Sequence, residues 1–431
     1  MATESFSFSN NFTHIIDGKK VGSQKTLPVI NPSTGEVLAN VPVATREQLD
    51  ETVKAASRPF RLRGHAFRRA PSDCGASCGL YCTALRPIRQ LLKKEAGKDT
   101  TSATFEVTIS LGWLQGVAKQ TLEDETQIDT DEKKAEVRYL PHGVCAGLIP
   151  WNFPLALVIL KVAPALLTGN CLIIKPSPFA PLAAMKFIEL AQKVVPPGVL
   201  SVLSGDDELG PWIVEHPDIP RISMTGSIAG GKAIMRNAAT NLKDLTMELG
   251  GNDPAIVLDD VDPAKIAPLL FRVPMRTQNK AQYEIVKRFI DDCHKNGYKF
   301  ALGGQVDTSS KGYFIPLTII DNPPEDSKIV QEEQFGPIVP LLKWSDDDEV
   351  VKRANDTVYG LSASVWGHDL KRVESIANRL QAGSVWINEW AALTPDLPMS
   401  GIKQSGIGYE NSKHGLFSWT KIQAITRNKA F

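Results

Sequence analysis

Apolar residues are most concentrated between residues 144 and 176. Two short apolar runs, Val144 to Ile149 and Cys171 to Ile174, flank an apolar segment of helical length, and Pro150 and Lys175 follow the two runs. This order predicts a β-strand, a crossover helix and a parallel strand. The runs lack polar alternation, which indicates strands that are covered on both faces. The pattern therefore predicts an α/β fold built on a parallel sheet.

The same rhythm continues downstream. Helical spacing over residues 184–195 precedes a turn at residues 196–198, a strand over residues 199–203 and a helix over residues 209–215. A strand over residues 221–224 then ends in Thr225-Gly226-Ser227, where a new helix begins. Free backbone amides at such a helix start can receive a phosphate. A simple strand-to-helix turn is the alternative interpretation of this tripeptide.

The remaining patterns predict further elements. Short antiparallel strands are expected over residues 12–43 and a helix over residues 45–56, followed by a long helix over residues 105–122, a solvated acidic stretch over residues 123–131 and a strand over residues 136–140. In the last third, helices are expected over residues 349–355 and 371–381, and strands over residues 384–388 and 420–426.

Ligands of open parallel sheets bind at the carboxyl ends of the strands. That edge here carries Asn152, in the stretch PWNFP, and Lys175, in KPS. An amide and a cation are thus the first chemical candidates. A turn residue between prolines and a solvated lysine are the alternative interpretations.

Four ordered motifs together resemble the NAD(P)-dependent aldehyde dehydrogenases: PWNFP (150–154), KPS (175–177), MTGS (224–227) and ELGG (248–251). The resemblance covers residues 11–56 and the chain from residue 137 onward. It implies a Rossmann-like cofactor domain over 1–247, a truncated α/β catalytic domain over 248–415 and a C-terminal oligomerisation strand over 416–431. Residues 125–140 would belong to a small β oligomerisation hairpin.

The resemblance also implies roles for individual residues. Glu248 matches the general base that activates water, and Asn152 matches the amide that holds an oxyanion. A solvated strand end is the alternative for Glu248. Cofactor contacts are implied for the following residues: Ile149, Pro150, Trp151, Lys175, Ser177, Gly205, Gly226, Ser227, Leu249, Glu333 and Phe335.

The cofactor implied by the resemblance is NAD or NADP. Lys175 matches a lysine that contacts the adenosine ribose hydroxyls or a 2′-phosphate. Pro178 stands where many NAD-preferring members carry an acid, and a neutral residue removes repulsion against a 2′-phosphate, so NADP is admissible. An exposed acid and a core aromatic are the alternative interpretations of Glu333 and Phe335.

In this family a catalytic cysteine segment follows ELGG, and the chain contains no such segment. Residues 259–271 match the family, residues 272–276 differ from it, and residues 277–283 match a later part of it. Cys293, the only cysteine downstream, lies in a helical pattern typical of a core residue, with a substitute nucleophile as the alternative. The loss also predicts exposed sheet edges in the catalytic half.

Three functional hypotheses follow. The first is an oxidoreductase that oxidises a small-molecule aldehyde to a carboxylic acid with NAD(P). The second is a catalytically inactive member that binds dinucleotide or forms homo-oligomers or mixed oligomers with intact relatives. The third is a defective gene product without a stable fold.

Charge and composition exclude other classes. Of 431 residues, 42% are hydrophobic, and Lys plus Arg and Asp plus Glu both number 48, so the overall charge does not attract nucleic acid or an anionic membrane. The first residues resemble no signal peptide, and the longest apolar segment is too short to span a bilayer. Six cysteines in a chain of this length indicate reduced thiols, and a cytoplasmic location is expected.

Residues 58–89 differ from their surroundings, with seven arginines against one acid and the cysteines Cys74, Cys78 and Cys82. A basic binding patch and a metal site are the functional interpretations. No fourth metal ligand is evident, so we predict no metal. An altered or poorly ordered segment, as a local change of reading frame would also produce, is the alternative that we favour.

Overall fold

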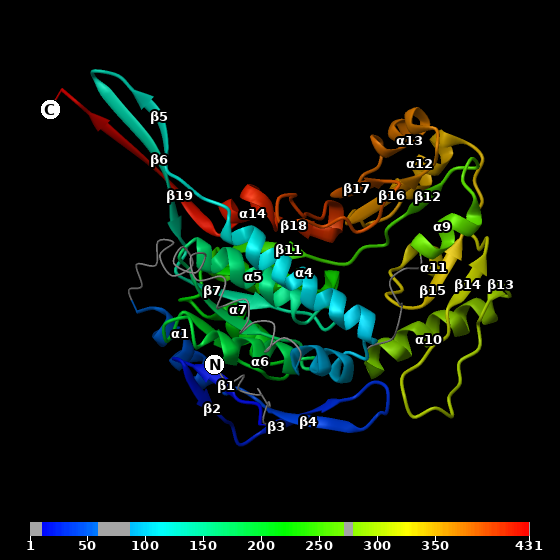
Figure 1. The fold of residues 1–431 in the computed structure, drawn as a ribbon, viewed down its shortest axis with the longest axis horizontal. Helices are drawn as coiled ribbons and strands as arrows, with labels where there is room; N and C mark the ends of the chain where they lie inside the picture. Colours follow the sequence, from blue (N-terminus) through cyan, green and yellow to red (C-terminus); the bar gives the residue numbers. More distant parts are fainter. Residues whose placement is uncertain (1–10, 59–86, 271–278, 431) are drawn as a thin grey trace, which may run out of the picture.

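The computed structural model describes residues 11–58, 87–270 and 279–430. The predictions for Cys74, Cys78 and Cys82 lie outside these residues. The chain forms an α/β fold around an eight-stranded sheet with the order β18-β11-β10-β7-β8-β9-β1-β2 (Figure 1). The predicted fold class is confirmed.

The centre of this sheet consists of five parallel strands, which are β7 (Val144–Leu148), β8 (Cys171–Lys175), β9 (Leu200–Val202), β10 (Arg221–Thr225) and β11 (Asp244–Glu248). Strands β8 and β9 continue the sheet on one side of β7, and β10 and β11 continue it on the other. The strand order therefore reverses between β7 and β10. In such sheets ligands bind in the crevice at the carboxyl edge of this reversal point.

Helices cover both faces of the sheet, as the unbroken apolar runs predict. One face packs against α4 (Thr100–Ala118), α5 (Ala156–Leu167) and α6 (Leu182–Ala191). The other face packs against α1 (Arg46–Ala56), α7 (Leu209–Glu215) and α8 (Ile228–Ala238). Successive strand residues alternate between the two cores: Cys145 lies in the first and Ala146 in the second.

The N-terminal residues form the antiparallel pairs that the sequence predicts. Strand β1 (His14–Ile16) pairs with β2 (Lys19–Val21), and β3 (Thr26–Ile30) pairs with β4 (Val37–Pro42). At the other end of the large sheet, β18 (Gly406–Ile407) pairs antiparallel with β11. The sheet is thus completed by a segment from the last tenth of the chain.

Residues 255–387 contain two separate three-stranded sheets. The first has the order β12 (Ala255–Val257), β16 (Ser362–Trp366) and β17 (Ser384–Ile387), and the second has the order β13 (Lys299–Leu302), β14 (Thr318–Asp321) and β15 (Ile338–Leu341). Their helices are α9 (Pro263–Leu270), α10 (Lys280–Lys295), α11 (Lys328–Gln331), α12 (Asp347–Asn355) and α13 (Leu370–Ala377). Strands β12 and β17 are the edges of the first of these sheets, and β13 and β15 are the edges of the second.

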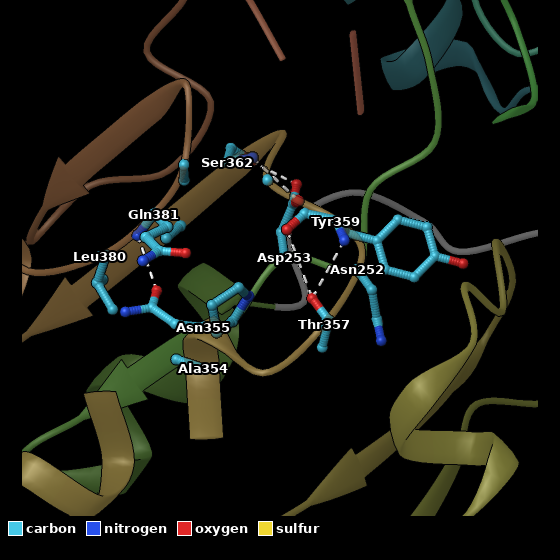
Figure 2. Close-up of a pocket in the computed structure, with 13 residues that line it drawn as sticks. Asn252, Asp253, Ala354, Asn355, Thr357, Tyr359, Ser362, Leu380 and Gln381 are labelled. Atoms are coloured by element: carbon cyan, nitrogen blue, oxygen red, sulfur yellow. Dashed lines mark hydrogen bonds between the residues drawn. The ribbon is translucent and has the colours of Figure 1, made fainter. Parts of the chain in front are cut away.

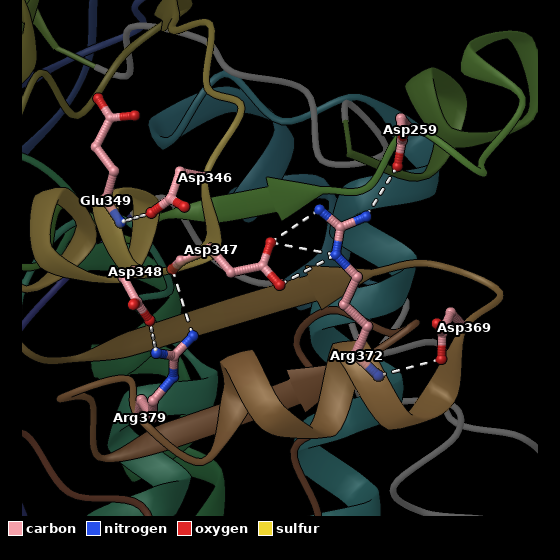
Figure 3. A network of polar contacts seen from close by, with 8 residues as sticks. All are labelled: Asp259, Asp346, Asp347, Asp348, Glu349, Asp369, Arg372 and Arg379. Carbon is pink, nitrogen blue, oxygen red and sulfur yellow. Dashed lines mark hydrogen bonds and ion pairs between the residues drawn. The ribbon is translucent and has the colours of Figure 1, made fainter.

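A network of charged side chains joins the elements of the first small sheet (Figure 3). Arg372 on α13 bonds Asp347 on α12 through Nε and Nη2, and Asp259 after β12 through Nη1 at 3.0 Å. Arg379, which follows α13, donates from Nη1 to the Asp348 carboxylate and from Nη2 to the Asp347 carbonyl. The network fixes α12 and α13 against the end of β12.

One prediction about the preceding region is wrong in its bounds. The long helix begins at Thr100 rather than Phe105, because the Asp99 side chain caps it by accepting from the Ser102 N–H at 2.7 Å. The acidic stretch over residues 123–131 is largely exposed, as predicted, and it also contains a strand, β5 (Glu125–Asp129), which pairs with β6 (Lys133–Pro141). Strand β19 (Thr420–Asn428) pairs with the other edge of β6. These three strands form an arm that projects from the body (Figure 1).

Among the described residues, no helix combines the length and apolar character needed to cross a membrane.

Candidate functional site

A cavity of about 490 Å³ lies at the carboxyl ends of β7 and β10, where the strand order reverses. It is bounded by the loop after β7, the end of β8, the start of α7 and the first turns of α8. Seven of the sequence-predicted cofactor residues line it: Ile149, Pro150, Trp151, Lys175, Ser177, Gly226 and Ser227. The structure therefore brings most of the predicted binding residues together.

The other predicted cofactor residues lie outside this cavity. Gly205 is buried against Leu209, and the side chain of Leu249 packs over Gly231. Phe335 lies edge-on to Trp151, with ring centroids 5.3 Å apart, and so adjoins the cavity through that residue. Phe335 is 43% exposed, so the interpretation of this residue as a core aromatic is wrong.

The turn between β10 and α8 brings the N-terminus of this helix to the wall of the cavity. Ser227 caps α8 by accepting from the Gly230 N–H at 3.1 Å, and the Gly226 N–H donates to the Glu248 carbonyl at 2.9 Å. The first amides of α8 have no partner within the helix and point toward its N-terminus. A Cβ atom at Gly226 would lie 2.4 Å from Met224 Cε, so any larger residue there would displace the end of the Met224 side chain.

Glu333 contacts the segment that follows β11. Its Oε1 accepts from the Gly251 N–H at 3.0 Å, and its own N–H donates to Tyr359 Oη at 3.1 Å. The side chain is half-buried, and burial raises its pKa. The interpretation of Glu333 as an exposed acid is therefore wrong. In this structure its carboxylate is bound to the glycine pair that follows Glu248.

The candidate base Glu248 ends β11 and is 4% exposed, so it is not a solvated strand end. Its Oε1 is buried without a hydrogen-bond partner among the described residues. Burial raises its pKa to about 8, and the charge of Glu410 adds to the rise while Lys161 opposes it. Such a carboxyl group exchanges its proton near neutral pH, as a general base requires.

Asn152, the candidate oxyanion donor, follows β7 in the loop that begins with Pro150. The loop is held to the sheet by a hydrogen bond of 3.0 Å from the Ile149 N–H to the Lys175 carbonyl. Its side-chain Oδ1 is buried without a partner among the described residues. Asn152 and Glu248 thus lie at the same edge of the sheet, after β7 and β11, which flank β10.

A buried polar triad of Lys161, Ser223 and Glu410 lies beneath this edge, and the sequence analysis did not predict it. Lys161 on α5 contacts Ser223 on β10 and Glu410, with Nζ 2.9 Å from both oxygen atoms, and Ser223 Oγ donates to Glu410 Oε1 at 2.6 Å. Lys161 crosses β7 at Gly147, where a Cβ atom would lie 3.3 Å from Lys161 Cδ. The only signal in the sequence is a lysine that interrupts an otherwise apolar helix.

We expect the protonation of Glu248 to make stability depend on pH. Folding raises its pKa from 4.5 to about 8, so between these values the folded state binds a proton that the unfolded state has lost. Stability contributed by this group is therefore present below pH 4.5 and is lost as pH rises toward 8, by up to about 1.4 kcal/mol per pH unit. Urea unfolding of the wild type and Glu248→Gln across this range measures the effect.

In Glu248→Gln the decline of unfolding free energy with rising pH should be shallower, because glutamine does not titrate. Glu36→Gln, at an exposed position, should retain the wild-type slope. Equal slopes for wild type and Glu248→Gln would contradict the assignment of a raised pKa to Glu248.

Three cysteines lie in the described residues, and all are buried free thiols: Cys145, Cys171 and Cys293. Burial raises their pKa values to about 12, 11 and 11 respectively. None lines the cavity described above. Cys293 faces the core of the second small sheet, as its helical pattern predicts. These thiols lack the low pKa that a nucleophile requires.

A second, much smaller cavity of about 10 Å³ is lined in part by the end of α12 and the start of β16 (Figure 2). Asp253 accepts there from the backbone and the hydroxyl of Ser362, and Asn355 Oδ1 accepts from the Gln381 N–H at 2.8 Å. The volume suits one water molecule rather than a substrate. No group of three or more metal-binding side chains occurs among the described residues.

Comparison with known proteins places this architecture among related chains. The model of the aldehyde dehydrogenase family matches residues 20–276 and 274–425. A putative aldehyde dehydrogenase, FUS7, from Gibberella moniliformis is 36% identical over 455 residues, which cover 96% of this chain and 98% of that protein. Betaine aldehyde dehydrogenase from Rhizobium leguminosarum is 30% identical, with 96% of each chain covered.

Solved structures agree with the sequence comparison. A betaine aldehyde dehydrogenase from Staphylococcus aureus in complex with NAD⁺ superimposes with a TM-score of 0.90 at 26% identity, over 97% of each chain. An NADP-dependent enzyme from E. coli superimposes with a TM-score of 0.91 at 26% identity, over 96% of this chain and 98% of that chain.

Proposed function

Because this chain belongs to the aldehyde dehydrogenase family, we propose that it binds a nicotinamide dinucleotide in the cavity at the carboxyl edge of its large sheet but does not itself oxidise aldehydes through a cysteine. The cavity between α7 and α8 is the observation that supports binding. When bound, the dinucleotide supplies a hydride acceptor. The chain's own residues would hold its phosphates at the start of α8 and its adenosine between the two helices.

The residues of the cavity fit such a ligand. The lining combines a bare glycine turn for the phosphates with apolar side chains for an aromatic base, including Pro211, Val214 and Ile234. Lys175 supplies a cation at the end of β8. Pockets for nucleotides combine a mainly apolar surface with a few polar groups in this way.

The proposed loss of covalent chemistry rests on the cysteines. Aldehyde oxidation in this family begins when a thiolate attacks the carbonyl carbon, which makes hydride departure feasible. The sequence between Gly251 and Cys293 contains no cysteine, and the three described thiols are buried with raised pKa values. The groups that would assist a thiolate, Asn152 and Glu248, are retained without it.

Aldehyde oxidation is the second candidate function, and one observation favours it. Glu248 is buried with a pKa of about 8, and its Oε1 has no hydrogen-bond partner among the described residues. A catalytically inactive protein does not require such a group. The two candidates differ in whether aldehydes cause reduction of the dinucleotide. They share the prediction that the dinucleotide binds.

A thermal-shift titration with NAD and NADP tests binding. At 100 times the dissociation constant, a ligand stabilises the folded state by about 2.7 kcal/mol, so the melting temperature should rise. Ala233→Trp places an indole in the cavity and should abolish the shift, whereas Met235→Trp, at an exposed position of the same helix outside the lining, should retain it. The absence of any shift in the wild type would refute the proposal and favour a defective product.

Reduced-dinucleotide formation with a panel of aldehydes separates the two candidates. We expect none from the purified chain. Turnover that is abolished by thiol alkylation would instead establish aldehyde oxidation.

We extend the proposal to assembly and location. The projecting arm of β5, β6 and β19 carries Ile422, which is 69% exposed. An exposed apolar side chain on this arm supports pairing with a second copy or with a family relative. The free thiols among the described residues support a reducing, cytoplasmic location.

A further inference from the structure

Only two of the residues that line the large cavity are charged, and their charges cancel. Lys175 comes from the end of β8, and Asp207 comes from the loop between β9 and α7. The rest of the lining is apolar, glycine or neutral polar. A ligand at this end of the cavity therefore meets one ammonium group and one carboxylate.

The Asp207 carboxylate is available to a ligand. Its neighbour Asp206 forms an ion pair with Lys25, with Nζ and Oδ2 2.6 Å apart. Within the described parts of the chain, Asp207 has no such partner, and it is exposed. Lys175 is half-buried, and burial lowers its pKa. The charge of Asp207 is the largest effect that opposes this lowering. The two side chains therefore share one electrostatic environment.

Pro178 also lines the cavity and contributes neither a charge nor a hydrogen-bonding side chain. From the sequence alone, this neutral residue makes NADP admissible. The structure places an acid, Asp207, in the same cavity from a different loop. Pro178 cannot repel a 2′-phosphate, but the Asp207 carboxylate in the same cavity can.

We propose that Asp207 makes the chain prefer NAD over NADP, by accepting a hydrogen bond from the adenosine ribose hydroxyls and by repelling a 2′-phosphate. This inference rests on the proposed function, since it assumes that the dinucleotide occupies this cavity. A 2′-phosphate adds about two negative charges at neutral pH. Lys175 alone would attract it, but the Asp207 carboxylate opposes that attraction, and no second cation lines the cavity among the described residues.

The test measures dissociation constants of NAD and NADP for the full chain by isothermal titration calorimetry. The wild type should bind NAD at least about tenfold more tightly than NADP, a difference of about 1.4 kcal/mol. Asp207→Asn keeps an acceptor for the ribose hydroxyl and removes the charge. It should therefore tighten NADP binding by about tenfold and change NAD binding by less than about threefold.

Asp206→Asn is the matched control, because it removes the adjacent charge, which is already paired with Lys25. It should leave the NAD to NADP ratio unchanged. Raising the salt concentration should reduce the effect of Asp207→Asn, since the carboxylate is exposed and its field is screened.

The possible outcomes are distinct. NAD binding with an equal or higher NADP affinity in the wild type, or an unchanged ratio in Asp207→Asn, overturns the role of Asp207 and leaves the proposed function intact. A change of the ratio in Asp206→Asn as large as that in Asp207→Asn also overturns it, because a general charge effect would then explain the preference. Binding of neither dinucleotide overturns both proposals.

Discussion

Replacing Lys161 with methionine is expected to lower the free energy of unfolding by about 3–5 kcal/mol. Lys161 and Glu410 are fully buried, and Lys161 Nζ lies 2.9 Å from Glu410 Oε1. Removing the ammonium group leaves the Glu410 carboxylate buried without a cation, close enough to Glu248 to raise its pKa. Leaving a buried carboxylate without its cation lowers the free energy of unfolding far more than the loss of side-chain packing does.

Urea unfolding measures this change. The double variant Lys161→Met with Glu410→Leu should recover most of the lost stability, because no unpaired charge then remains. Lys20→Met, which breaks an exposed ion pair with Glu189, should cost less than about 1 kcal/mol. A similar cost for Lys161→Met and Lys20→Met would show that the buried triad contributes no more than a surface pair.

Replacing Glu106 with glutamine is expected to destabilise the chain by about 3 kcal/mol and to weaken dinucleotide binding. Glu106 on α4 is buried and accepts from the N–H groups of Leu155 and Ala156 at 2.8 and 3.1 Å, at the start of α5. Leu155 itself provides no side-chain cap. Glu106 also pairs with the buried Lys98, with Oε2 and Nζ 2.9 Å apart.

The effect on binding follows from the position of Lys98. Its ammonium group lies 3.8 Å from the centroid of the Phe153 ring, in the loop that carries Trp151 and Asn152. Glutamine cannot neutralise Lys98, so the ammonium group should no longer hold its position against Phe153. The loop should then become less fixed, and the cavity should lose part of its wall. Glu136→Gln, which breaks an exposed pair with Lys134 on the arm, is the control and should change neither property.

These expectations are checked by urea unfolding and by titration with NAD. Unchanged NAD affinity in Glu106→Gln, despite the loss of stability, would show that the loop is held by other contacts.

The parallel core of the fold follows directly from the sequence. Residues 144–149 and 171–174 are apolar without alternation, which is the pattern of strands buried on both faces, and the segment between them forms α5. The tripeptide at residues 225–227 likewise ends a strand and begins a helix. In these segments local pattern and tertiary environment favour the same structure.

Other features depend on contacts between distant segments. Strand β5 forms in an acidic, exposed stretch because β6 provides hydrogen-bond partners, which local pattern does not reveal. Lys161, Glu106 and Glu410 resemble surface residues in the sequence but are buried, because each meets its partner only in the folded chain. Asp207 belongs to an acidic run that is typical of a solvated turn, and only the cavity indicates another role.

The partner of Lys161 has a consequence for biosynthesis. Lys161 is translated 249 positions before Glu410, and β18, which closes one edge of the large sheet, lies only three residues before that glutamate. While the chain is attached to the ribosome, the lysine therefore has no carboxylate to neutralise it inside the nascent core. Contacts of such long sequence separation form late and leave apolar surface open in the meantime. Chaperones that shield emerging chains should consequently engage this protein until translation has finished.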